Sequence, residues 1–115
     1  MRILVVDDDI IIRHYFVRSL RRHADVHEAA DIAGARAKMQ ITSFDVIVAD
    51  AHLPDGSGIC LLEEARTLQA ACLGILMSTD DTVLAKGPER SFPKVGGLVQ
   101  IVALIRATPS ARASA

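Results

Sequence analysis

The chain has 115 residues, of which 50% are hydrophobic and 23% are charged, which is enough apolar surface for one compact domain and too much for a disordered segment. Its 13 Lys and Arg residues against 14 Asp and Glu residues leave a net charge of −1, which argues against direct nucleic-acid binding through bulk positive charge. Cys60 and Cys72 lie outside any CxxC spacing, so a zinc site is disfavoured and we expect both cysteines in the core. The apolar runs are too short for a membrane span and the N-terminus does not resemble a signal peptide, so we expect a cytoplasmic location without membrane contact.

The first half of the chain predicts two strands, each followed by a helix. The apolar run 3–6 is typical of a strand buried on both faces, and 26–29 predicts a second, short strand. Helical spacing predicts a helix over 10–22, capped by Asp8 or Asp9, and another from the cap Asp31 through Gln40. The side chains expected to face the core are Ile12, Tyr15, Phe16 and Leu20 in the first helix and Ile32, Ala35 and Met39 in the second, with Arg13, Arg18, Arg21 and Arg22 on the polar face.

The second half continues the alternation. The clearest strand, 44–49, is ended by Asp50, and a turn segment at 53–58 leads into a helix through about Leu68. A buried strand at 73–77, a short edge strand at 90–93 and a helix at 98–107 complete the expected elements. We therefore expect one α/β domain over 1–107 with a parallel sheet, and a flexible tail over 108–115.

Polar side chains follow several of these strands where each strand ends. They are Asp7, Asp8 and Asp9 after the first strand, Asp50 after the third, Ser78 after the fourth and Lys94 after the last. Ligands of open α/β sheets bind beyond the carboxyl ends of the strands, so these side chains mark the expected site.

Three carboxylates brought together there would repel one another unless a cation lay among them. Asp7, Asp8 and Asp50 offer only oxygen ligands, which suit Mg²⁺, with Mn²⁺ as the second choice. The Lys94 ammonium and the Ser78 hydroxyl would complete a set of groups able to clamp a phosphoryl group, and a carboxylate can itself be the nucleophile.

In this order and at these strand ends, five motifs together resemble the receiver domain of two-component response regulators, the CheY-like family. The motifs are Val5-Val6-Asp7-Asp8-Asp9, Phe44 to Asp50, Leu53-Pro54 with Gly58, Met77-Ser78-Thr79 and Phe92-Pro93-Lys94. The resemblance implies a flavodoxin-like, doubly wound sheet of five parallel strands in the order 2-1-3-4-5.

The same resemblance implies the roles of the site residues. Asp50 is the expected phosphoacceptor, Asp8 a direct Mg²⁺ ligand together with Asp50 and the His52 backbone carbonyl, and Asp7 a ligand through water. Ser78 and Lys94 would contact the phosphoryl group, while Pro54 and Gly58 would shape the loop behind the acceptor. The His52 side chain and Asp80 are candidates for tuning the reaction, although either can equally be an exposed loop residue without a role.

The implied function is to accept a phosphoryl group from a histidine kinase or a histidine phosphotransfer protein and to signal by contact with a downstream protein or in a homodimer. On this interpretation the chain is no enzyme beyond the transfer to, and hydrolysis from, its own aspartate. Two alternatives stay open: a receiver-like binding module that acts without phosphorylation, and a haloacid-dehalogenase-like phosphohydrolase that uses the Asp7-x-Asp9 pair. The interpretation without a functional site is that the acids cap a helix or a turn and that Ser78 and Lys94 are ordinary polar residues.

Three features depart from the family pattern. Val95 follows Lys94 where the family usually has proline, and Ser91 stands at the position of the usual switch aromatic, with Phe92 next to it. The link from Ser78 to Lys94 spans 94 − 78 = 16 positions, which predicts a shortened or missing fourth helix. The apolar stretch 101–105 is expected to pack in the core, with a dimer or partner surface as the alternative.

Overall fold

The computed structural model of the chain describes residues 1–80, 84, 90–94 and 96–107. Its main sheet has five parallel strands in the order β2-β1-β3-β6-β7. The strands are β1 (Arg2–Val6), β2 (Asp25–Ala29), β3 (Val46–Asp50), β6 (Leu73–Ser78) and β7 (Ser91–Pro93), and the described helices are α1 (Ile10–Leu20), α2 (Ile32–Ile41), α3 (Gly58–Leu68) and α5 (Leu98–Ala107). When these five strands are numbered along the chain, the order is 2-1-3-4-5, which confirms the predicted fold.

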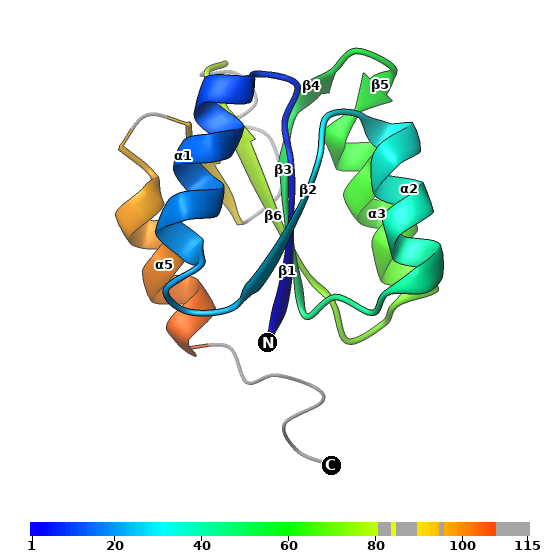
Figure 1. Cartoon of the computed structure of the whole chain (residues 1–115). Helices are drawn as coiled ribbons and strands as arrows, with labels where there is room; N and C mark the ends of the chain where they lie inside the picture. Colours follow the sequence, from blue (N-terminus) through cyan, green and yellow to red (C-terminus); the bar gives the residue numbers. More distant parts are fainter. Residues whose placement is uncertain (81–83, 85–89, 95, 108–115) are drawn as a thin grey trace.

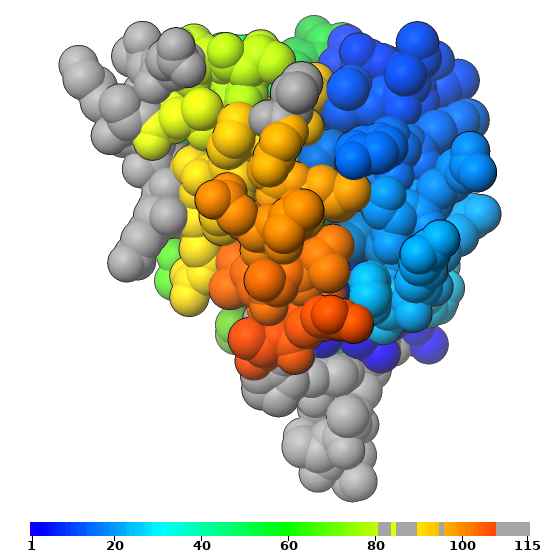
Figure 2. Space-filling model, turned by 90° about the vertical axis from the view of Figure 1, so that its left-hand side faces the viewer, coloured from blue at the N-terminus to red at the C-terminus, as the bar shows by residue number. Residues whose placement is uncertain are grey.

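Helices cover both faces of the sheet: α1 and α5 pack on one face, and α2 and α3 on the other (Figure 1). The face with α1 and α5 is seen directly in Figure 2, where the two helices lie side by side. Because successive strand residues point to opposite faces, Ile3 and Val5 join the core under α1 and α5, while Leu4 and Val6 join the core under α2 and α3. This double burial explains the uninterrupted apolar run of β1.

The inward face of α1 differs from the prediction. Phe16 and Leu20 are buried as expected, but Tyr15 is 53% exposed and Val17 takes the buried place instead. Positions 16, 17 and 20 form one stripe of the helix, and Tyr15 lies beside that stripe with its ring edge-on to Phe16. The helix also ends earlier than predicted, at Leu20.

The prediction of two core cysteines is half wrong. Cys72 is buried, and this burial, with the negative charge of Asp45 as the smaller cause, raises the pKa of its thiol to about 12. Cys60 is exposed, because in α3 the buried stripe is formed by Leu61, Leu62 and Ala65.

In α2 the expected inward residues Ile32, Ala35 and Met39 are all buried.

A short hairpin stands where the sequence predicted only a turn segment. Its strands β4 (His52–Leu53) and β5 (Gly56–Ser57) pair antiparallel to each other. Gly56 has a φ of 152°, a backbone conformation that favours glycine.

The last helix packs as expected for a core element. In α5, Ile101 and Ile105 are buried, and Val102 and Leu104 are half-buried against the same core. Phe92 of β7 is likewise half-buried against this core.

The four described helices agree with a shortened fourth helix between β6 and β7. Apart from Leu84, whose N–H donates to the Asp80 carbonyl at 3.1 Å, residues 81–89 lie outside the described part of the chain. The tail predicted over 108–115 also lies outside it. Within the described residues, none of the helices is both long and apolar enough to cross a bilayer.

Candidate functional site

The carboxyl ends of three neighbouring strands place three polar side chains in the same region. Asp7 follows β1 directly, while Asp50 and Ser78 are the last residues of β3 and β6. All three are buried, whereas Asp8 is exposed. Parallel strands end at the same edge of a sheet, so the sequence positions alone bring these groups together.

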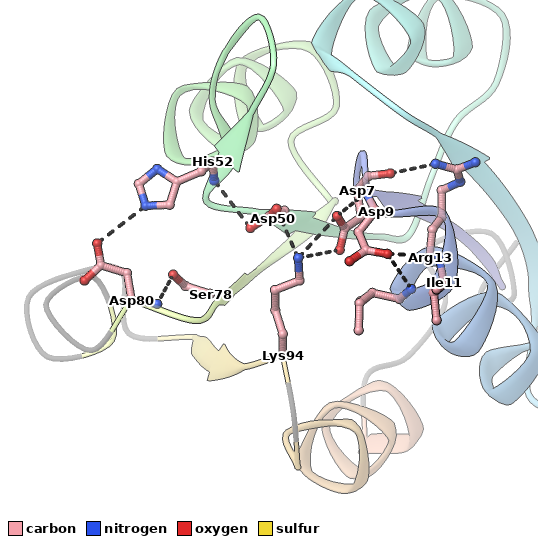
Figure 3. A network of polar contacts seen from close by, with 10 residues as sticks. Asp7, Asp9, Ile11, Arg13, Asp50, His52, Ser78, Asp80 and Lys94 are labelled. Atoms are coloured by element: carbon pink, nitrogen blue, oxygen red, sulfur yellow. Dashed lines mark hydrogen bonds and ion pairs between the residues drawn. The ribbon is translucent and has the colours of Figure 1, made fainter.

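Lys94 reaches this region from the turn after β7 and lies between the two buried carboxylates (Figure 3). Its Nζ lies 3.1 Å from Asp7 Oδ2 and 3.3 Å from Asp50 Oδ2, and its side chain is only 10% exposed. The backbone of Lys94 is held by a hydrogen bond from its N–H to the Ser78 carbonyl, at 3.2 Å. The ammonium therefore lies at the strand ends beside Asp7 and Asp50, even though Val95 stands where the family usually has proline.

The electrostatics of Asp7 and Lys94 reflect this burial. Burial raises the pKa of Asp7, although a hydrogen bond from the Asp9 N–H and the nearby Lys94 oppose the rise. For Lys94, burial alone would lower the pKa, but its hydrogen bonds and charge contacts with Asp7 and Asp50 outweigh burial and raise it. Asp7 and Lys94 thus form a buried charge pair in which each group stabilises the charged form of the other.

Asp7, Asp8 and Asp50 also form a candidate metal site. Each offers one carboxylate oxygen, and these oxygens lie within 4.8 Å of one another. Asp7 Oδ2 is buried, and among the described residues it lies 3.1 Å from the Lys94 ammonium. Three carboxylates that converge and offer only oxygen ligands fit a hard divalent cation such as Mg²⁺.

The backbone behind Asp50 is tightly packed against the start of α3. The Gly58 N–H donates to the Ala51 carbonyl at 2.9 Å, and the Ser57 side chain caps the helix by accepting from the Ile59 N–H. A Cβ atom at Gly58 would lie 1.9 Å from the Asp50 carbonyl oxygen, so only glycine allows this approach.

The hairpin after Asp50 is tied to α2 by Asp55, a residue not expected to have a role. Its carboxylate accepts from the N–H groups of Ile32 and Ala33 at 2.9 and 3.0 Å, and the first of these bonds is the main cause that lowers the pKa of Asp55. The Pro-Asp-Gly turn at 54–56 was the signal, since Asp in such turns commonly bonds to free backbone groups.

His52 and Asp80 lie at the outer rim of the site (Figure 3). The His52 side chain is 69% exposed, and its Nε2 lies 3.5 Å from Asp80 Oδ2. The His52 N–H approaches Asp50 Oδ1 at 3.4 Å, and the Asp80 N–H donates to Ser78 Oγ at 2.9 Å. The two residues considered for tuning are therefore in contact with each other beside Asp50.

Arg13 differs from its predicted place on the solvent face of the first helix. Its side chain is 13% exposed and lies against the strand ends, where Nη1 donates to the Asp7 carbonyl and Nε donates to Glu28 Oε1, both at 2.8 Å. Position 13 lies one turn after the helix cap Asp9, and this spacing was the available signal that its side chain could reach back to the acidic loop.

Comparisons with known proteins all point to one family. The model of the response regulator receiver domain matches residues 3–87. The two-component response regulator ARR14 of Arabidopsis thaliana is 32% identical over 83 residues, which are 70% of this chain and 22% of that protein. The chain spans less than a third of the length of the curated relatives it matches.

Solved structures show the same fold. A CheY-like response regulator receiver domain protein from Methanospirillum hungatei is 26% identical, with a TM-score of 0.80 over 92% of this chain and 90% of that one. The response regulator TrrA from Thermotoga maritima, solved in complex with Mg²⁺ and BeF, is 20% identical, with a TM-score of 0.83 over 94% and 98% of the two chains.

Proposed function

Because the chain belongs to the response regulator receiver domain family, whose members are signalling domains of two-component systems, we propose that it accepts a phosphoryl group on Asp50. The donor would be a histidine kinase or a histidine phosphotransfer protein in the cytoplasm. The observation that carries the proposal is the environment of Asp50, a buried carboxylate at a strand end, 3.3 Å from the Lys94 ammonium and clustered with Asp7 and Asp8.

In this proposal a carboxylate oxygen of Asp50 attacks phosphorus, an O–P bond forms, and the bond from phosphorus to the donor breaks. Asp8, Asp50 and the His52 backbone carbonyl would hold Mg²⁺ directly, and Asp7 would hold it through water. The cation would supply positive charge against the phosphoryl oxygens and the clustered acids. Lys94 and the Ser78 hydroxyl would bind the remaining phosphoryl oxygens.

The phosphorylated domain, residues 1–107, would then signal through a downstream protein or a second copy, with 108–115 as a flexible tail. His52 and Asp80 flank the acceptor, so they are the residues placed to control access of water to the phosphoryl group. The side chain of Asp7 is 0% exposed and that of Asp50 is 9% exposed, so a phosphodonor reaches Asp50 more readily, which disfavours the alternative in which Asp7 is the nucleophile of a phosphohydrolase.

The test is incubation with acetyl phosphate and Mg²⁺, followed by measurement of the intact mass. We expect the wild type to gain the mass of one phosphoryl group, Asp50→Asn to gain none, and Asp25→Asn, which changes an exposed acid outside the site, to behave as the wild type. Modification of Asp50→Asn, or no modification of the wild type by any donor, would refute the proposal. If no donor modifies the wild type, the remaining interpretation is a receiver-like binding module that acts without phosphorylation.

A further inference from the structure

Arg13 connects three elements at the edge of the acidic site. From α1 its guanidinium donates one hydrogen bond to the carbonyl of Asp7, at the end of β1, and another to Glu28 of β2, both at 2.8 Å. Glu28 pairs in register with Val5, two residues before Asp7, so the acid that receives Arg13 is itself fixed by the sheet.

The bonds of Arg13 complete a set that immobilises Asp7. The Asp7 N–H donates to the Ala29 carbonyl at 3.1 Å, and Asp7 Oδ1 accepts from the Asp9 N–H at 3.0 Å. Arg13 takes the remaining backbone group, the carbonyl. These bonds fix the peptide unit that leads directly into Asp8, so they also limit where the Asp8 carboxylate can lie.

We propose that Arg13 is a positioning residue for the acidic site, which with Glu28 holds the backbone at Asp7 so that the carboxylates of Asp7 and Asp8 converge on Asp50. The inference rests on the proposed function, because that function names Mg²⁺ as the ion these carboxylates hold. Residues that orient metal ligands by hydrogen bonds commonly change metal affinity 10- to 100-fold when they are replaced.

The charge of Arg13 acts in the opposite direction, which makes the proposal testable. A cation beside an acidic site repels Mg²⁺, so loss of the charge alone would strengthen binding. Loss of the positioning bonds would weaken it. The direction in which the Mg²⁺ affinity changes therefore distinguishes a role of Arg13 in positioning from a role of its charge.

The experiment is a calorimetric Mg²⁺ titration of the whole chain and four variants. Arg13→Met keeps most of the aliphatic stem but removes charge and donors, and we expect its dissociation constant to rise about ten-fold. Arg13→Lys keeps the charge without the two-pronged donor and is expected to recover only part of the affinity. Glu28→Gln keeps an acceptor oxygen but loses the charge that attracts Arg13, and its dissociation constant should rise less than that of Arg13→Met. Arg18→Met, the control at another arginine of α1, should bind Mg²⁺ as the wild type does.

A second expected result is kinetic. With acetyl phosphate as the donor, Arg13→Met should need more Mg²⁺ for half-maximal phosphorylation, while its rate at saturating Mg²⁺ stays near that of the wild type. Tighter Mg²⁺ binding by Arg13→Met, together with wild-type binding by Arg13→Lys, would overturn the proposal, because Arg13 would then act by charge alone.

Amide hydrogen exchange in the metal-free protein tests the positioning itself. We expect faster exchange at Asp9, whose N–H bonds to Asp7, in both Arg13 variants, with unchanged exchange at Val48 inside the sheet. If the wild type binds no Mg²⁺, the metal part of the proposed function fails, and exchange at Asp9 still decides the role of Arg13. Unchanged exchange at Asp9 in both variants would refute it.

Discussion

Replacement of Gly58 by alanine should destabilise the fold and displace Asp50, the proposed phosphoacceptor. The new Cβ would lie 1.9 Å from the Asp50 carbonyl oxygen, whereas real Cβ atoms essentially never approach within 3.0 Å, so the two backbones must separate by at least about 3.0 − 1.9 = 1.1 Å. Overpacking of this kind costs about 1–3 kcal/mol. The same shift stretches the hydrogen bond from Gly58 to the Ala51 carbonyl, a loss of about 1 kcal/mol.

We therefore expect the free energy of unfolding of Gly58→Ala to fall by about 2–4 kcal/mol, measured by urea denaturation. A displacement of about 1 Å at a reacting group can cost about 100-fold in rate, so phosphorylation of Asp50 by acetyl phosphate should slow by a similar factor. Both measurements are made without and with Mg²⁺ at saturation, so that a change in metal affinity is not mistaken for a change in the acceptor.

Gly74→Ala is the matched control for this substitution. Its Cβ would lie 3.3 Å from the end of the Leu62 side chain, which can move, and we expect a change in stability of less than about 1 kcal/mol. If Gly58→Ala were as stable and as rapidly phosphorylated as Gly74→Ala, the packing argument for Gly58 would be wrong.

Three further predictions concern single side chains. Lys94→Met leaves two buried carboxylates without their cation and should lower the free energy of unfolding by about 3 kcal/mol at neutral pH. The pKa of Lys94 is raised above its ordinary value of 10.5 in the folded state. The difference in the free energy of unfolding between wild type and Lys94→Met should therefore stay constant from neutral pH up to about 10.5, and should shrink as the pH rises further through the folded pKa. Asp9→Ala removes the cap of α1 and should cost about 1 kcal/mol, most of which Asp9→Ser restores. Iodoacetamide should modify exposed Cys60 in the native protein and spare Cys72, which is buried and has a pKa of about 12, as peptide mass mapping would show. The argument for Lys94 would be wrong if Lys94→Met were destabilised equally at all alkaline pH values. The argument for Asp9 would be wrong if Asp9→Ala were as stable as the wild type, and the argument for the cysteines would be wrong if both thiols were labelled equally.

The sheet and the strand-end cluster were predictable because few physical choices were open to those residues. Apolar runs as continuous as 3–6 and 46–49 need burial on both faces, which in a chain that alternates strands with helices means a parallel sheet. The polar residue after each run, such as Asp7 or Asp50, must then lie at one edge. The order of the strands came from the family resemblance, since periodicity gives elements and not their neighbours.

Other features depend on details that no periodic pattern carries. Tyr15 and Val17 flank Phe16 on the surface of the helix, and a small rotation of the helix about its axis decides which of the two side chains is buried. Arg13 could extend into water or fold back onto the strand ends, and the partner that favours folding back, Glu28, lies on a different strand. Cys60 was assigned to the core by residue type alone, a weak argument within a helix that already had enough apolar residues.

The bond between Asp7 and Lys94 joins positions 87 residues apart, almost the full length of the described chain. Closing a loop of this size is entropically costly, and contacts of such long range slow folding. Any folding route that pairs β1 with β3 before β7 docks passes through a stage in which Asp7 and Asp50 face each other without their ammonium. If the proposed Mg²⁺ site is occupied on such a route, the ion offsets the repulsion between these two carboxylates before Lys94 docks.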